Sequence, residues 1–191
     1  MLLLSQGRIV ADDGPETVTQ VYLAGASGTS TFTSTGRRTA NRQVEIVDAW
    51  LETQGERAES FIFGDLVDVV LRVRIYERVR FSVEIMLRQQ DGLPVAFAPS
   101  GLSKDWELDE PAGEVVVRCR LPRIDLAAGG YSLDLILAAT GSHFLDHLES
   151  GLAFHVDSAA IGAHNWGFNQ AIGQGCRLWD VEFKKDRSIA S

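Results

Sequence analysis

Aromatic rings and arginines carry the most suggestive chemistry in this sequence. The chain has four tryptophans and nine phenylalanines, and its 18 cations divide into 15 arginines and only three lysines. An aromatic ring offers an apolar face to the C–H side of a sugar ring, and planar polar groups match the hydroxyls around its edge. Arginine also binds carboxylates and phosphates through two parallel hydrogen bonds, which lysine does not. Such residues can serve a carbohydrate site, and they can equally serve core packing and surface ion pairs.

Four residues are the strongest candidates for contact with a sugar. Trp166 lies among amides and glycines beside Asn165, and that composition is typical of a sugar platform. Trp106 lies in a charged loop, and Phe97 follows the turn at Asp91-Gly92. Each aromatic ring also has a plain packing interpretation, because Trp166 can anchor the C-terminal segment on the core and Phe97 can face inward.

Five arginines occupy the outward positions of predicted strands: Arg72, Arg74, Arg88, Arg118 and Arg120. If several of them share one sheet, they form a cationic floor that suits an anionic terminal sugar, such as a keto-acid or a phosphorylated residue. The alternative is an ordinary solvated surface, on which they pair with acids such as Glu84, Glu114 and Asp134. We include Arg72, Arg74, Arg88 and Arg118 among the candidate binding residues.

The sequence offers little support for catalysis. His143 and His147 are four residues apart, but their strand context argues against a metal site, and no Cys/His spacing indicates zinc. We find no nucleophile elbow and no carboxylate pair that suggests glycoside hydrolysis. We therefore expect no catalytic residue, no metal and no cofactor.

Apolar and polar residues alternate with a period of two along several segments, notably 67–76, 81–88, 131–137 and 152–156. This period predicts half-buried strands separated by turns, and no long helix interrupts them. The pattern predicts an all-β fold, an antiparallel immunoglobulin-like β-sandwich. The short segment Glu77-Arg78 suggests a tight hairpin between two of these strands. Trp50, in phase with Val44 and Ile46, is expected to face the core, as is Cys119.

The 191 residues divide unequally. Residues 1–24 predict two short strands and a helix, 25–41 a flexible Gly/Ser/Thr linker, 42–183 the sandwich and 184–191 a disordered tail. The formal charge of −8 argues against nonspecific nucleic-acid binding, and no apolar run is long enough to span a membrane. The composition and the two cysteines suggest a cytoplasmic protein.

Two parts of the chain resemble known families. Leu3-Leu4-x-x-Gly7-Arg8-Ile9-Val10-Ala11 resembles the C-terminal end of an ABC transporter ATPase subunit, although no GxxxxGK[ST] loop is present to hold ATP. The later motifs resemble the β-sandwich of Wzt-type ATPases, which export O-antigen polysaccharides. These motifs are Val44-x-Ile46, Phe63-Gly64-Asp65, Arg88-x-x-Asp91-Gly92-x-x-Val95-x-Phe97 and Leu121-Pro122-x-x-x-Leu126-x-x-Gly129-x-Tyr131.

The resemblance implies a noncatalytic role. In that family the sandwich recognises the modified non-reducing terminus of a lipid-linked polysaccharide and couples chain termination to export. It also implies a homodimer with C-terminal strand exchange, a transmembrane transporter subunit as partner, and a cytoplasmic location at the inner membrane of a Gram-negative bacterium. The strand that carries Phe97 is expected to lie on the ligand-facing sheet. The alternative is a structural or dimerisation module without direct glycan binding.

Overall fold

The computed structural model describes residues 1–5, 8–15, 32–40, 43–102, 106–139, 142–162, 166–170, 175–178 and 181. The first strands are β1 (Leu2–Ser5), β2 (Arg8–Asp12), β3 (Arg37–Ala40), β4 (Val44–Thr53), β5 (Glu56–Arg57), β6 (Ser60–Phe61), β7 (Asp68–Ile75) and β8 (Val79–Gln89). They are followed by β9 (Pro94–Pro99), the 3-10 helix η1 (Ser100–Leu102), β10 (Leu108–Glu110), β11 (Gly113–Arg120), β12 (Gly129–Ala139), β13 (His143–Val156), β14 (Ala160–Ile161) and β15 (Trp166–Gly167).

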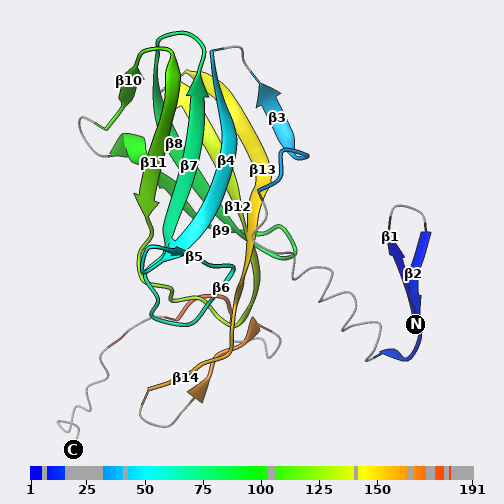
Figure 1. The fold of residues 1–191 in the computed structure, drawn as a ribbon. Coiled ribbons are helices and arrows are strands. Elements are labelled where there is room, and N and C mark those ends of the chain that lie inside the picture. Colours follow the sequence, from blue (N-terminus) through cyan, green and yellow to red (C-terminus); the bar gives the residue numbers. More distant parts are fainter. Residues whose placement is uncertain are drawn as a thin grey trace, which may run out of the picture.

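Two sheets face each other and form the sandwich (Figure 1). The smaller sheet has the order β11-β7-β4-β5. The larger sheet has the order β10-β8-β12-β13-β3, with β9 added beside β8 and β6 beside β13. Among the named strands of the sandwich, all pairings are antiparallel except that of β6 with β13. The predicted all-β, antiparallel sandwich is therefore confirmed.

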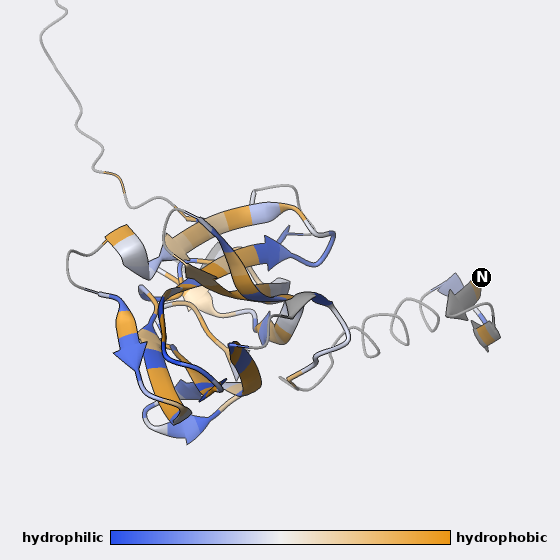
Figure 2. Ribbon diagram, turned by 90° about the horizontal axis from the view of Figure 1, so that it is seen from above, coloured by the Kyte–Doolittle hydropathy of each residue, from blue (hydrophilic) through white to orange (hydrophobic). Residues whose placement is uncertain are grey.

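The core lies between the two sheets and follows directly from the alternation in the sequence. Val69, Leu71 and Val73 of β7 face Leu133, Leu135 and Leu137 of β12, and all six are buried. Hydrophobic and hydrophilic residues alternate along several strands of the sandwich (Figure 2). The hydrophilic positions face outward, so each sheet presents a surface of its own on the outside of the sandwich.

A β-bulge in β4 makes the prediction for Trp50 wrong. Ile46 pairs with Val73 and Asp48 pairs with Arg72, so Val47 is an extra residue and the alternation shifts by one. Beyond the bulge, Ala49 and Leu51 are buried, whereas Trp50 lies on the outer face. The bulge is braced from β13 and β3, because the backbone N–H of Ile46 donates to Asp146 over 2.8 Å and Arg37 donates to the carbonyl of Ile46 over 3.0 Å.

The segment at Glu77-Arg78 is a crossing between sheets, and the predicted hairpin is wrong. β7 belongs to the smaller sheet and β8 to the larger one. The backbone N–H groups of Tyr76 and Glu77 both donate to the carbonyl of Gln43, which ends the pairing of β7 where the chain turns away. The inward apolar residues of the two strands face each other across the core. A short connection between two strands occurs in this arrangement as well as in a hairpin, so the sequence does not distinguish them.

Part of the predicted linker belongs to the sandwich, because β3 pairs with β13 at the edge of the larger sheet. The strands expected near the N-terminus exist as β1 and β2, which pair with each other. The predicted N-terminal helix and the tail at 184–191 lie outside the described residues, and the other domain boundaries stay predictions. Within the described ranges, no helix is long and apolar enough to cross a membrane.

Candidate functional site

The outer face of the larger sheet brings together side chains from four adjacent strands. Met86 on β8 lies opposite Phe97 on β9 and opposite Asp134 on β12. One row further along, Ile136 on β12 lies between Glu84 on β8 and His147 on β13. Arg88 and Phe144 lie on the same side of the sheet. We call these eight residues the outer-face site: Glu84, Met86, Arg88, Phe97, Asp134, Ile136, Phe144 and His147.

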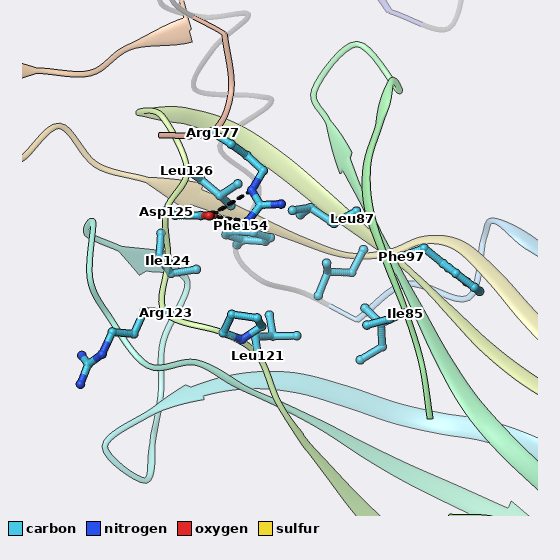
Figure 3. Close-up of a pocket in the computed structure, with 14 residues that line it drawn as sticks. Ile85, Leu87, Phe97, Leu121, Arg123, Ile124, Asp125, Leu126, Phe154 and Arg177 are labelled. Carbon is cyan, nitrogen blue, oxygen red and sulfur yellow. Dashed lines mark hydrogen bonds and ion pairs between the residues drawn. The ribbon is translucent and has the colours of Figure 1, made fainter. Parts of the chain in front are cut away.

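Phe97 is one of two exposed aromatic residues of this site, the other being Phe144. Its neighbours Ala96 and Ala98 lie opposite Leu87 and Ile85, which face the interior, so the alternation sends Phe97 outward. Half of its surface is exposed, at 51%, and although Phe97 is among the residues that line the cavity beneath β9, its ring points away from the centre of that cavity (Figure 3). An exposed ring held on a strand is a platform for the apolar face of a ligand.

Arg88 and Asp134 form a fixed ion pair beside Phe97. Arg88 Nε donates to Asp134 Oδ2 over 2.8 Å, and a second guanidinium nitrogen donates to the carbonyl of Gly92 over 3.0 Å. The Asp134 side chain is fully buried, because β13 bulges over it and the backbone N–H of Ser150 donates to Oδ1 over 2.8 Å. Ser150 takes a left-handed φ of 49° to make this turn. The Arg88 side chain is 21% exposed, so most of the pair is screened from solvent.

Glu84 and His147 flank Ile136 and have spare hydrogen-bonding capacity. Among the described residues, none forms a hydrogen bond or ion pair with the Glu84 carboxylate, and burial raises its pKa. His147 Nε2 likewise has no hydrogen-bond partner within the described part of the chain and lies 3.9 Å from Asp134 Oδ2. The ring of Phe144, which is 47% exposed, packs edge-on against the His147 imidazole with 5.5 Å between ring centroids. The Glu84 carboxylate can accept hydrogen bonds from a ligand on the face, whereas His147 Nε2 is buried and points toward Asp134.

The arginines do not form one cationic floor. Arg72, Arg74 and Arg118 lie on the outer face of the smaller sheet, on the opposite side of the sandwich from Arg88. Their partners are carboxylates: Asp48 at 3.3 Å from Arg72, Glu114 at 2.7 Å from Arg74, and Glu52 with Arg118. Arg74 lowers the pKa of Glu114, and Arg118 lowers that of Glu52. Arg120 pairs with Asp68 on the same face, so four arginines do share one sheet, but carboxylates neutralise them and they form no cationic floor. Of the acids expected as partners, Glu114 and Asp134 are paired, and within the described ranges Glu84 is not.

Trp50 and Trp106 lie away from the outer-face site, and Trp179 lies outside the described residues. Trp106 is half-buried and packs against the core. Trp50 donates its indole N–H to Glu52 over 2.6 Å, and the guanidinium of Arg57 lies 4.2 Å from its ring centroid, so one ring face is covered. The backbone of Trp166 forms β15 with Gly167, and Asn165 lies outside the described residues.

A cavity opens between the two sheets beneath β9. Its volume is about 170 Å³, and its lining is mainly apolar: Ile85, Leu87, Leu126, Leu133 and Phe154. Arg177 forms an ion pair with Asp125 at its mouth (Figure 3), where the C-terminal segment crosses and Leu178 N–H donates to the Asp125 carbonyl over 2.9 Å. A sugar needs converging polar groups, and the charged groups of this lining already have partners, since Arg177 binds Asp125 and Arg123 donates to the Gly64 carbonyl. The outer-face site is therefore the better candidate.

No described group of three or more His, Cys, Asp or Glu side chains is arranged to hold a metal ion. The two cysteines are free, and burial raises the pKa of the Cys119 thiol to about 11, which makes it a poor nucleophile. The described geometry is that of a strand-built surface with an aromatic platform and fixed polar groups. Fold and site together define a β-sandwich domain with a candidate binding surface on its larger sheet.

The comparisons with known proteins name the family. The Wzt C-terminal domain family matches residues 35–170, and the chain belongs to this family. The family is associated with carbohydrate binding in O-antigen ABC transporters. The crystal structure of the C-terminal domain of Wzt covers 83% of this chain and 92% of its own, with 17% identity and a TM-score of 0.66. It shows the same fold.

Two further structures match more weakly. β-D-mannosidase from Dictyoglomus thermophilum is 16% identical over 56% of this chain and 13% of its own, with a TM-score of 0.40. A Niemann-Pick type C2 protein from the Japanese carpenter ant is 10% identical over 66% of this chain and 99% of its own, with a TM-score of 0.47. No curated protein matches the sequence.

Proposed function

We propose that the outer-face site binds the modified non-reducing terminus of a lipid-linked O-antigen polysaccharide and thereby couples chain termination to export by an ABC transporter. The observation that carries this proposal is the exposed ring of Phe97 beside the fixed Arg88–Asp134 pair. The ring stacks on the apolar face of the terminal sugar, and the polar groups around it contact the hydroxyls. The family of the chain supports a carbohydrate as the ligand.

The proposed role requires no bond to be made or broken. Binding of the finished glycan end raises its local concentration at the transporter, because the binding domain and the transporter are tethered to each other. Phe97 and Arg88 are the predicted site residues that this proposal places in contact with the glycan. Arg88 acts mainly by holding its planar edge still, because its partner Asp134 fixes the guanidinium.

We also propose the partners that the family resemblance implies. The chain forms a homodimer by exchanging a strand near its C-terminus, and its parent protein works with a transmembrane transporter subunit at the cytoplasmic side of the inner membrane of a Gram-negative bacterium. Residues 178–183 suit an exchanged strand, because Trp179, Val181 and Phe183 alternate with acids. β9 is an edge strand that pairs only with β8 among the described strands, and it is open to such a partner.

The test is an NMR titration of the chain with terminated and with unterminated polysaccharide. The proposal expects the terminated glycan to perturb the resonances of Phe97, Glu84 and His147, and the unterminated glycan to leave them nearly unchanged. Equal and negligible perturbation by both glycans would refute it.

The open edge of β9 favours one second candidate, a structural module that dimerises or braces the transporter without touching glycan. Deletion of residues from about 160 onward separates the two functions. Loss of the dimer with retained glycan binding supports binding as a separate role. If the intact chain dimerises but no glycan perturbs its outer face, the structural module is the better account.

A further inference from the structure

The charges of the outer-face site indicate which kind of glycan end it accepts. Arg88 is the arginine of this site. Its Nε donates to Asp134, and a second guanidinium nitrogen donates to the Gly92 carbonyl. A bidentate contact with an anion would have to compete with one of these two partners, Asp134 or the Gly92 carbonyl. Because Asp134 is fully buried, movement of Arg88 away from it would leave an uncompensated charge inside the protein. Arg88 is therefore a poor anion receptor.

Glu84 is the charge that stays uncompensated. Its cross-strand neighbours are Pro99 on β9 and Ile136 on β12, and neither offers a hydrogen bond from its side chain. His147 lies on the far side of Ile136, with its Nε2 nearest to Asp134. Glu149 on β13 pairs with Arg38. The charges of Arg88 and Asp134 cancel, so the formal charge that remains on the site is that of Glu84.

We propose that Glu84 accepts hydrogen bonds from the hydroxyls of an uncharged terminal sugar stacked near Phe97, and that the site discriminates against termini carrying a phosphate or a carboxylate. This inference rests on the proposed function and specifies its substrate class. The two carboxylate oxygens of Glu84 suit a pair of neighbouring hydroxyls, because an ionised carboxylate only accepts hydrogen bonds. An anionic group at the same place meets like charge in a partly desolvated position, where the repulsion is stronger than in water.

The raised pKa of Glu84 is consistent with this role, since a carboxylate without a partner is kept half-buried at a cost to folding. The same charge inventory argues against the anionic terminal sugar considered from the arginine content. The arginines of the smaller sheet, Arg72, Arg74 and Arg118, are paired with acids and lie on the other side of the sandwich.

The experiment compares neutral and anionic sugars on the whole chain by NMR, following the Phe97 ring. The probes are the methyl glycosides of glucose, mannose, galactose and rhamnose, and, for the three hexoses, the corresponding 6-phosphates and uronates. We expect at least one neutral glycoside to bind, and its anionic counterparts to bind about tenfold or more weakly. For a sugar without an anionic counterpart in the panel, the comparison is made with the anionic probes as a group.

Glu84→Gln is the decisive variant, because it keeps the shape and removes the charge. It should weaken the binding of neutral probes by about tenfold and reduce the difference in affinity between neutral and anionic probes. Glu56→Gln changes an exposed acid on the smaller sheet and is the matched control. It should change neither the affinity for neutral probes nor that difference. Anionic probes that bind as tightly as neutral ones, or an E84Q variant that binds like the unmodified chain, would overturn the inference and leave the proposed function standing. If no probe and no polysaccharide reaches the face, both proposals fall.

Discussion

Arg88 and Asp134 show why charged residues on a strand must be judged by their partners. The Asp134 carboxylate is fully buried on the outer side of β12, and the ion pair with Arg88 compensates its charge. Removal of one partner from a buried pair costs far more than removal of an exposed one, because the other charge stays desolvated. Arg88 is thus first a structural residue of the site, and its contact with ligand depends on that role.

Arg88→Ala should lower the free energy of unfolding by about 3 kcal/mol, measured by urea denaturation. Arg72→Ala is the control, since Arg72 is 46% exposed and pairs with the partly exposed Asp48, so its loss should cost less than about 1 kcal/mol. Equal effects of the two substitutions would show that the Arg88 pair is no stronger than a surface pair.

Glu84 predicts a specific pH dependence of stability. Burial raises its pKa above the ordinary value of 4.5, so the folded chain holds this proton more tightly than the unfolded chain does. The contribution to stability is present below pH 4.5 and is lost as the pH rises through the folded-state pKa. Glu84→Gln should therefore raise the free energy of unfolding at pH 7 and change it little near pH 3.5. A loss of stability at pH 7 would contradict this assignment.

At the scale of elements, the alternation of apolar and polar residues predicts most strands. It does not predict the β-bulges, which change the face on which the following residues lie. Arg88 could be named from sequence because the period of two assigns it to the outer face, and Phe97 because the family resemblance implies that its strand lies on the ligand-facing sheet. The extra residue Val47 reverses that assignment for Trp50. The pairing of Asp134 with Arg88, and the position of Ile136 between Glu84 and His147, depend on cross-strand register, which a single sequence does not contain.

Outward-facing Glu84 and Met86 follow from the alternation of the predicted strand at 81–88, so sequence could have supplied them as surface residues. It could not single them out, because nothing in the strand alone places them beside Phe97. The sequence also could not predict which sheet carries each arginine. β7 and β8 are separated by only three residues, yet they belong to different sheets.

The attachment of β3 to β13 depends on the close approach of one glycine. A Cβ added at Gly36 would lie 2.2 Å from the backbone carbonyl oxygen of Glu149, and the Glu149 N–H donates to the Gly36 carbonyl. Gly36→Ala should force the two strands apart and lower the free energy of unfolding by about 1–3 kcal/mol. Faster hydrogen exchange at the β13 amides next to β3 would confirm the cause, and Gly14→Ala, with open space around its Cβ, should have no effect. Unchanged exchange and stability in Gly36→Ala would refute it.

The whole molecule predicts where the chain can be shortened. The hydrogen bonds recorded for the described part of residues 1–15 stay within that segment, whereas Arg37 of β3 binds the buried Asp146 at 2.5 Å. Deletion of residues 1–31 should therefore leave the unfolding midpoint unchanged. Deletion of residues 1–41 should lower the free energy of unfolding by about 3 kcal/mol, because Asp146 loses its cation. Equal midpoints for the two shortened chains would show that β3 contributes nothing.

The large excess of arginine over lysine also has a whole-molecule explanation. Arginines link strands of the same sheet and join edges to neighbouring strands, as in Arg74–Glu114 and Arg120–Asp68. A planar guanidinium suits such paired contacts better than an ammonium does. The arginines therefore serve mainly to join neighbouring strands through ion pairs. The described arginines do not form a cationic binding surface on this protein of net charge −8.

The central claim is that Phe97 is the platform on which the glycan end is bound. Calorimetric titration with terminated polysaccharide should show that Phe97→Ala weakens binding by about tenfold or more, because the stacking surface is lost. Val116→Ala removes an exposed apolar side chain from the smaller sheet and should bind like the unmodified chain. If Phe97→Ala binds terminated polysaccharide as tightly as Val116→Ala does, the outer face of the larger sheet is not the binding surface.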